Sequence, residues 1–296
     1  MGNVLDAQQN LPGDIDIEIA TLRNSCNANV RVSGHRTMPI NDEDIKLFEL
    51  TPETLMQGVA ELHGKPPLDV MLTQTWADVY TIFSAWKPVE KTVKAVGAKV
   101  VDANYTIVNV ATRRYINNSD VTASFKSCFT ETVINTVSST WSNELRFNAG
   151  INYKLKFPGS VDLGYTAKCG TEVNRSQSVK ITAEDSVNFK LGPKKAVIVH
   201  LNSRKNKIFV KIEYEISLVG EVFCRYIEPP SLMTFYRLSV NNVLNKMNKP
   251  TVVKLSEVVE LDYHSDGEIV LNSINSTPSS TDGYCQKYNV LDYNFP

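Results

Sequence analysis

The residues that could carry out acid–base or metal chemistry are scattered along this chain. Its four histidines are His35, His63, His200 and His264. None of them lies in an HExxH, GxSxG or glycine-rich phosphate-binding motif. We therefore expect ordinary core or surface histidines, no enzyme active site and no cofactor.

Two other groups of metal-ligating side chains also lack the spacing of a binding site. Asp42, Glu43 and Asp44 supply oxygen atoms suited to Ca²⁺, but they lack the glycine-containing loop of an EF-hand, so we expect a solvated loop. The cysteines form no CxxC pair and are too few for a disulfide framework. They are Cys26, Cys128, Cys169, Cys224 and Cys285. The sequence thus predicts neither a metal site nor thioredoxin-like chemistry.

The composition of the 296 residues excludes several classes of protein. A net charge of -1 and a pI near 6.4 disfavour binding to nucleic acid. A mean hydropathy of -0.19, with no apolar run of eighteen residues, predicts a chain without a spanning helix. No secretory signal is visible in MGNVLDAQQN, although a mature secreted chain would look the same. We expect a secreted or released soluble protein.

The strongest pattern lies in residues 145–173, LRFNAGINYKLKFPGSVDLGYTAKCGTEV, where every charge occupies an even-numbered position. Side chains alternate between the two faces of a β-strand, so odd and even positions predict two surfaces. The uncharged surface, which we expect to face lipid, contains Leu145, Phe147, Ile151, Tyr153, Leu155, Phe157, Val161, Leu163, Tyr165 and Ala167. The charged surface, which we expect to face a water-filled lumen, contains Arg146, Lys154, Lys156, Asp162, Lys168 and Glu172.

The separation of odd-numbered and even-numbered residues onto two faces predicts the length of the turn in the ribbon formed by residues 145–173. A three-residue loop of Pro158, Gly159 and Ser160 keeps one face apolar, whereas a two-residue loop would mix the faces. The resulting pairs are Leu155 with Leu163, Tyr153 with Tyr165, Ile151 with Ala167, Lys156 with Asp162, and Arg146 with Glu172. Arms of about 13 residues would cover about 33 Å along a tilted barrel, enough for an apolar band of about 25 Å. The alternative is an amphipathic hairpin with one face on a protein core.

The flanking elements divide the chain into three predicted regions. Residues 1–95 form a mixed head, with a helix over 51–64 and an aromatic stripe that includes Trp76, Tyr80 and Trp86. These aromatic side chains either pack in a core or bind a receptor. Residues 96–227 form an elongated β body, and residues 228–296 form a C-terminal β region with shorter strands in TVVKL, EVVEL and GEIVLN.

The order of these parts resembles the aerolysin-like β-pore-forming proteins, in particular the branch of epsilon toxin and the Mtx toxins. The resemblance covers residues 100–227 and rests on VTASFKSCFTETVINTVSSTWS, ELRFNAGINYKLKFPGSVDLGYTAKCG, SVKITAEDSVNFKL and GPKKAVIVHL. It implies an elongated, mainly β fold, with a head that selects an unknown receptor on a target-cell membrane. It also implies a homo-oligomeric ring of about seven copies and a ribbon that becomes a transmembrane barrel. The alternative function is a non-lytic egg or yolk storage protein with the same fold.

Overall fold

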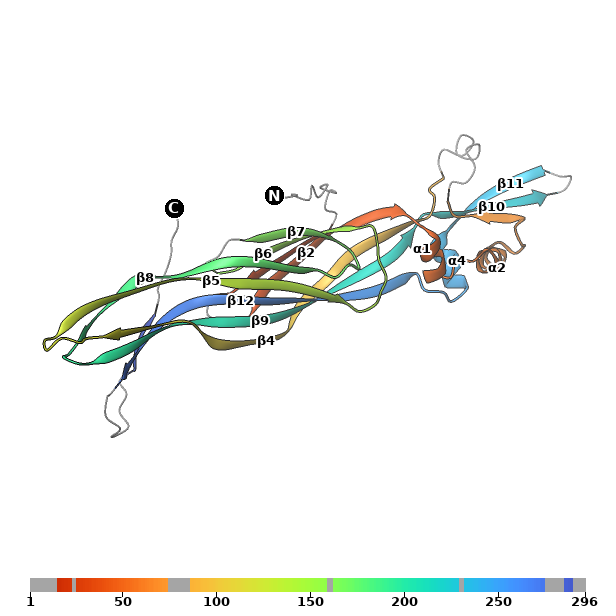
Figure 1. The fold of residues 1–296 in the computed structure, drawn as a ribbon. Helices are drawn as coiled ribbons and strands as arrows, with labels where there is room; N and C mark the ends of the chain where they lie inside the picture. The colour runs from red at the N-terminus through yellow and green to blue at the C-terminus, as the bar shows by residue number, and fades with distance from the viewer. Residues whose placement is uncertain are drawn as a thin grey trace, which may run out of the picture.

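The protein is an elongated β structure with a small helical head at one end (Figure 1). The computed structural model describes residues 15–22, 25–73, 86–158, 162–228, 232–274 and 285–289. The strands of the body are β1 (Ile15–Thr21), β2 (Ala28–Pro39), β4 (Glu90–Ile116), β5 (Ala123–Trp141), β6 (Gly150–Lys156), β7 (Leu163–Lys168), β8 (Asn174–Leu191), β9 (Ala196–Val219), β12 (Val252–Ile274) and β13 (Cys285–Asn289). The head contains α1 (Asp42–Leu47), α2 (Pro52–His63), β3 (Asp69–Met71), β10 (Glu221–Glu228), β11 (Leu232–Ser239) and α4 (Val240–Lys246).

One long sheet forms the body, in the order β7-β6-β1-β2-β4-β9-β12-β5-β8, with β13 paired to β12. Strands β4, β9 and β12 have 27, 24 and 23 residues, whereas five or six residues are usual. This confirms the expected mainly β, elongated architecture. The prediction of separate short strands after residue 228 is wrong in one respect, because VVKL, EVVEL and GEIVLN belong to the single strand β12. Its interruption is a register shift between Ser265 and Gly267.

Alternation of apolar and polar residues explains why β9 is a central strand. Ile208, Val210, Ile212 and Tyr214 are fully buried, while Phe209, Lys211 and Glu213 between them are partly or fully exposed. Burial of each such side chain contributes about 1.5–3 kcal/mol relative to exposure. The same rule places the odd-numbered residues of β5 toward the interior along most of that strand.

Two of the apolar clusters among the described residues fill the interior of the body, with polar side chains between them, and a third, around Trp86 and Phe223, lies in the head. The larger cluster includes Ile212 and lies toward the head, while the smaller one includes Phe129 and Leu201. Near the register shift of β12, the buried Asn206 amide donates to the Ser265 hydroxyl at 2.8 Å. The body therefore has polar contacts in its interior at the place where the β12 ladder is irregular.

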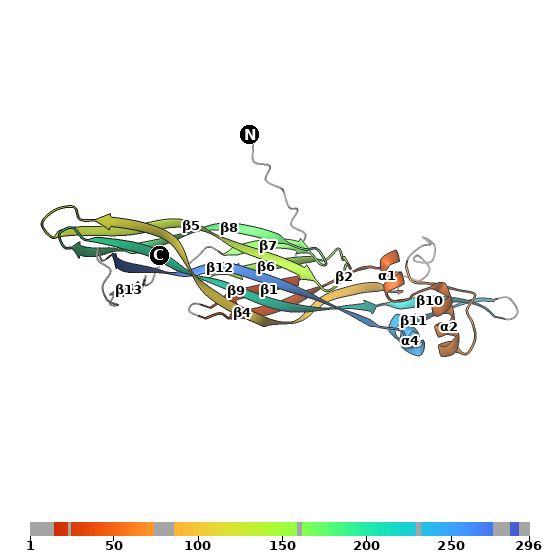
Figure 2. The same cartoon turned by 60° about the horizontal axis from the view of Figure 1, so that its bottom comes forward.

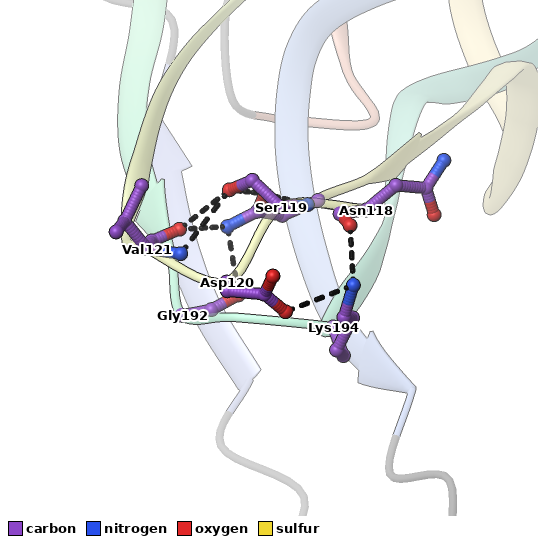
Figure 3. A network of polar contacts seen from close by, with 7 residues as sticks. Asn118, Ser119, Asp120, Val121, Gly192 and Lys194 are labelled. Atoms are coloured by element: carbon purple, nitrogen blue, oxygen red, sulfur yellow. Dashed lines mark hydrogen bonds and ion pairs between the residues drawn. The ribbon is translucent and has the colours of Figure 1, made fainter.

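The β4–β5 and β8–β9 turns lie at the end of the body opposite the head (Figure 1), and polar contacts join them (Figure 3). The buried Asn117 amide donates to three backbone carbonyl groups at 2.8–2.9 Å, those of Val121, Leu191 and Gly192. Lys194 donates to the Asn118 carbonyl at 2.7 Å and pairs with Asp120 at 3.0 Å. These contacts join two turns that are about 75 residues apart in sequence.

The head contains a three-stranded sheet in the order β11-β10-β3, together with the helices. The predicted helix over 51–64 is confirmed as α2, in which Thr51 accepts a hydrogen bond from the Thr54 backbone and Pro52 occupies the first turn. It ends at Gly64, whose φ of 83° favours glycine. The loop expected at Asp42–Asp44 is wrong, because these residues begin α1 and Asp44 is buried.

Strands from all three predicted regions pair in the long sheet. β1 and β2 lie within residues 1–95, and β12 lies within 228–296, yet they share the sheet with β5 and β9. The head sheet likewise joins β3 to β10 and β11. Pairing between distant strands depends on three-dimensional packing, so a linear division of the sequence does not describe it.

Candidate membrane-insertion hairpin

The β6–β7 hairpin has the register that parity predicts. Its antiparallel pairs include Leu155 with Leu163, Tyr153 with Tyr165, and Ile151 with Ala167, which confirms the expected apolar face. On the other face, Lys154 lies opposite Gly164 and Lys168 lies opposite Gly150. The turn residues 159–161, including Val161, lie outside the described part of the chain.

The arms of the hairpin are shorter than predicted. β6 has 7 residues and β7 has 6, rather than about 13 in each arm. Pairing ends at Gly150 and Lys168, so the predicted ladder pair of Arg146 and Glu172 is wrong in this structure. The chain turns at Gly170, which has a φ of 83° and where an added Cβ would lie 2.0 Å from the Leu145 carbonyl oxygen.

The turns that precede β6 and follow β7 fold the hairpin back along the body. β6 pairs parallel with β1, and the ladders from β1 through β2, β4, β9 and β12 to β5 are all antiparallel. It follows that β6 runs opposite to β5, the strand that precedes it. The hairpin is therefore an insertion between β5 and β8 that doubles back, as both ribbon views show (Figures 1 and 2).

The uncharged face of the hairpin is packed against the body. Its most deeply buried members are 0–5% exposed: Phe147, Ile151, Tyr153, Leu155 and Phe157. Leu145, Leu163, Tyr165 and Ala167 are partly buried against the same cluster. The ring centroid of Phe157 lies 5.2 Å from that of Tyr263 in β12, and Tyr153 stacks on Tyr165 at 4.7 Å. The apolar face thus has a protein partner in this conformation.

The charged face of the hairpin is directed toward solvent. All six predicted residues on this face are exposed: Arg146, Lys154, Lys156, Asp162, Lys168 and Glu172. Lys156 forms an ion pair with Glu18 of β1 at 2.5 Å, and Asn152 donates to Asp16 at 3.3 Å. Because the ion pair is on the surface, it contributes little to holding the hairpin in place.

A buried carboxyl group lies beneath the hairpin. Glu257 of β12 is 0% exposed, and its Oε2 accepts hydrogen bonds from the Tyr153 hydroxyl at 2.6 Å and the Tyr214 hydroxyl at 2.8 Å. Tyr153 belongs to the hairpin, whereas Tyr214 belongs to β9. The Tyr153–Glu257–Tyr214 cluster therefore links the hairpin to two strands of the body.

Burial controls the titration of this cluster. It raises the pKa of the Glu257 carboxyl above its usual value, and hydrogen bonds from Tyr153, Tyr214 and Ser139 oppose the shift. Burial, with Tyr214 and Glu257 close by, also raises the pKa of the Tyr153 hydroxyl well above its usual value. Burial raises the pKa of the Cys169 thiol to about 12. The interface therefore favours neutral forms of these groups.

A second buried carboxylate lies near the start of the hairpin and has a cationic partner. Asp44 of α1 accepts a hydrogen bond from Lys91 of β4 at 2.5 Å, and the two side chains are 2% and 4% exposed. The Lys91 ammonium lies 5.1 Å from the ring centroid of Phe147, so the hairpin segment covers the ion pair.

Sequence reasoning missed Glu257, Tyr214, Asp44 and Lys91 as residues at the hairpin interface. A signal for Glu257 exists in β12, where it interrupts the alternation of Leu255, Val259, Leu261 and Tyr263, all of which are buried. A lone acid on an apolar face predicts a buried carboxyl group. No comparable signal in the sequence identifies Lys91 as the counter-ion of Asp44.

The three aromatic residues predicted to bind a receptor or pack in a core have different outcomes. Trp76 and Tyr80 lie outside the described residues, as does most of the predicted aromatic helix. Trp86 is 3% exposed, packs 5.2 Å from the Phe223 ring and donates to the Glu221 carbonyl at 2.9 Å. In this structure Trp86 is therefore a core residue of the head, not a surface contact.

Two features are absent from the residues that the structure describes. In those residues, no three His, Cys, Asp or Glu side chains are arranged to hold a metal ion. Across the same ranges, no helix combines the length and apolar character needed to cross a bilayer.

Comparison with known proteins identifies the fold. No protein-family model matches the chain. It is 25% identical over 250 residues to U-megalopygitoxin(8)-Mc8 of Megalopyge crispata, covering 83% of this chain and 87% of that protein. It is 24% identical over 249 residues to U-megalopygitoxin(8)-Mo12 of Megalopyge opercularis, covering 82% and 86%.

The solved structures include one with a closely related architecture. Parasporin-2, a Bacillus thuringiensis toxin that recognises cancer cells, superposes with a TM-score of 0.61 at 14% identity, covering 80% of this chain and 97% of parasporin-2. That similarity and the long antiparallel sheet show that the chain has the fold of the aerolysin-like β-pore-forming proteins.

Proposed function

We propose that this protein is a β-barrel pore-forming protein. Its soluble form binds a target membrane through an unknown receptor, assembles into a ring of about seven copies and inserts the β6–β7 hairpin. The observation that carries the proposal is the packing of an uncharged hairpin face on the body, while the opposite face carries six exposed charged residues. A β-hairpin with these two faces can exchange a protein core for lipid without burying a charge.

The topology supports a release in which the hairpin straightens. β5 and β8 pair with each other, and in the sequence they directly precede and follow the hairpin. Straightening would therefore make β6 a continuation of β5 and β8 a continuation of β7. The register of each ladder is given by the sum of the two residue numbers in a cross-strand pair. This sum is 312 in β5–β8 pairs such as Ser138–Asn174, and 318 in hairpin pairs such as Leu155–Leu163. The offset of six residues is even, so odd-numbered side chains stay on one face when the two ladders merge.

A ring of chains is needed because one hairpin leaves unpaired backbone groups at its edges. Each unsatisfied N–H or C=O in the hydrocarbon region costs several kcal/mol, and closure into a barrel removes these edges. In such a barrel the odd-numbered residues, including Leu155 and Leu163, would contact lipid. The even-numbered residues, including Lys154 and Lys168, would line the lumen.

A reversible crosslink between the hairpin and the body tests the proposal. Ala20 of β1 and Lys156 of β6 are neighbouring partners, so Ala20→Cys with Lys156→Cys should form a disulfide in a background with the native cysteines replaced by serine. Oxidised protein should bind target cells but release no dye, and a reductant should restore release. The test uses cells and liposomes loaded with a small dye, before and after limited proteolysis.

A matched control separates hairpin release from general rigidity. Glu18→Cys with Arg31→Cys staples β1 to β2 and leaves the hairpin unattached. This variant should release dye when oxidised. Dye release by the oxidised Ala20–Lys156 pair would contradict hairpin insertion. Absence of release from every variant, the parent protein included, would favour the non-lytic storage function.

A further inference from the structure

The outer end of the head carries the most exposed apolar residues of the head sheet. Ile227 at the end of β10 and Leu232 and Met233 at the start of β11 are 58%, 65% and 54% exposed. Ile227 pairs with Met233 on one face of this hairpin end, and Leu232 pairs with Glu228 on the other face, so apolar side chains lie on both faces of the end. Both ribbon views place this end at the extreme of the molecule, farthest from the closed turns of the body (Figures 1 and 2).

Charges near this hairpin end, which we call the head tip (Ile227, Leu232 and Met233), are paired within the protein. Glu228 pairs with Lys65 at 2.6 Å, and Arg237 pairs with Glu221 at 3.8 Å. The remaining pair is Arg225 with Asp69. The charged residues of β3, β10 and β11, together with Lys65, are thus three acids and three bases. This balance does not produce the basic cluster that anionic lipids attract.

The size and shape of the head tip favour lipid as its partner. A stable protein interface needs about 800 Å² on each partner, which is much more than three side chains at the end of two strands can supply. A bilayer interface accepts a narrow, convex apolar group, because the surrounding lipid adapts to its shape.

The direction of the chain places the head tip on the side where a straightened hairpin would extend. β5 runs parallel to β9, because both are antiparallel to β12, and β9 leads directly into β10 of the head. A hairpin that continues β5 would therefore point toward the head. Sixteen residues from Trp141 to Phe157 span about 53 Å when extended.

The head tip lies about as far from the level of Trp141 as the turn of a straightened hairpin would. Trp141 pairs with Glu257, and Glu257 pairs with Ile212 in β9. From Ile212 to Glu228 is also sixteen residues along β9 and β10, again about 53 Å when extended. The turn of a straightened hairpin and the head tip would thus reach one plane.

We propose that the head tip, formed by Ile227, Leu232 and Met233, inserts into the interface of a neutral phospholipid membrane and orients the body above it. The orienting role of the tip rests on the proposed pore formation, whereas lipid binding by the tip is measured separately from it. Binding depends on apolar side chains and is therefore insensitive to salt and to anionic lipid.

Vesicle sedimentation with matched variants tests the tip. Ile227 and Ile107 are both 58% exposed isoleucines, and Ile107 lies in β4 of the body. Ile227→Glu in the full chain should weaken partition onto phosphatidylcholine vesicles about tenfold, since burial of one apolar side chain typically changes an equilibrium by that factor or more. Ile107→Glu should change it less than about twofold. Equal partition of the two variants would overturn the proposal.

A fluorescence measurement locates the tip directly. Leu232→Trp should gain emission that brominated phosphatidylcholine quenches, after subtraction of the signal from the three native tryptophans, whereas Ile107→Trp should not. Quenching of neither variant, or tighter binding to vesicles that contain phosphatidylserine at low salt, would overturn the assignment of a neutral lipid contact.

Dye release distinguishes failure of the tip from failure of the pore. If the parent protein binds phosphatidylcholine vesicles through the tip but never releases dye, the tip assignment stands and the proposed pore fails. If Ile227→Glu releases dye as efficiently as the parent at equal concentration, the tip assignment fails and the pore stands.

Discussion

The two buried carboxyl groups near the hairpin have opposite electrostatic surroundings. Asp44 is paired with Lys91 at 2.5 Å, so its charge has a counter-ion inside the protein. Glu257 Oε2 accepts hydrogen bonds from the neutral Tyr153 and Tyr214 hydroxyls, and burial raises the pKa of this carboxyl. Both lie beneath residues of the hairpin segment, Phe147 and Tyr153 respectively.

This difference suggests separate roles for the two groups. The ion pair joins α1 of the head to β4 of the body, and the hairpin segment only covers it. The Glu257 carboxyl instead joins the moving element to the body, and its proton occupancy changes with exposure to water. Stability of the head junction should therefore depend on Asp44 and Lys91, while hairpin docking should depend on Tyr153 and Glu257.

The largest expected effect comes from breaking the ion pair. Lys91→Met should lower the free energy of unfolding by about 3–5 kcal/mol, because Asp44 is left buried without a counter-ion. Urea denaturation at neutral pH measures the loss. Lys156→Met, which breaks the exposed pair with Glu18, is the control and should leave the midpoint nearly unchanged. Similar midpoints for both variants would remove the distinction between the two sites.

A smaller, local effect is expected from Tyr153→Phe. Loss of its hydroxyl leaves Glu257 with one tyrosine donor and should cost about 1–3 kcal/mol. Hydrogen exchange should accelerate in β6 and β7 but not in β9. Tyr165→Phe is the matched control, because the buried Tyr165 hydroxyl has no hydrogen-bond partner among the described residues. Faster exchange in the control alone would contradict the assigned role of Tyr153.

The next largest effect should be that of pH on the packing of the β6–β7 hairpin against the body. Because the docked state raises the pKa of Glu257, it binds the proton more tightly than a state that exposes the carboxyl. This contribution is complete below the ordinary value of 4.5 and is lost as pH rises through the raised value. Exchange of the β6–β7 amides, corrected for intrinsic rates, should therefore accelerate with pH.

Glu257→Gln isolates this contribution from other titrating groups. Glu18 and Glu228 have lowered pKa values, caused chiefly by hydrogen bonds from Lys156 and Lys65, and they act in the opposite direction. The difference between the parent and Glu257→Gln cancels their effect. Identical pH profiles for the two proteins would show that Glu257 does not control docking.

The smallest expected effect concerns ion selectivity of the proposed pore. Lys154 and Lys168 face glycines across the hairpin, so in a ring they would form two cationic belts that favour anions. Screening within about 8 Å at physiological salt keeps the preference modest. Planar-bilayer reversal potentials should favour chloride over potassium, and Lys154→Glu with Lys168→Glu should invert this. Cation selectivity of the parent would place these residues outside the lumen.

The sequence predicts the local geometry of the hairpin but not its docking. Parity alone predicts the pairing of Tyr153 with Tyr165 and of Leu155 with Leu163, because strand side chains alternate with a period of two. The same pattern cannot distinguish lipid from a protein core as the partner of that face. Pattern also failed to show that the arms end at Gly150 and Lys168, where the chain turns back.

What the sequence by itself determined is the alternation, the faces and the register of neighbouring strands, which are properties of residues close together in the chain. Tertiary structure alone decided that β6 lies beside β1, that Glu257 meets Tyr153, and that Asp44 meets Lys91. These partners are 47 to 136 residues apart. Their contacts depend on how distant apolar faces pack together to exclude water, and no local period of side chains encodes that packing.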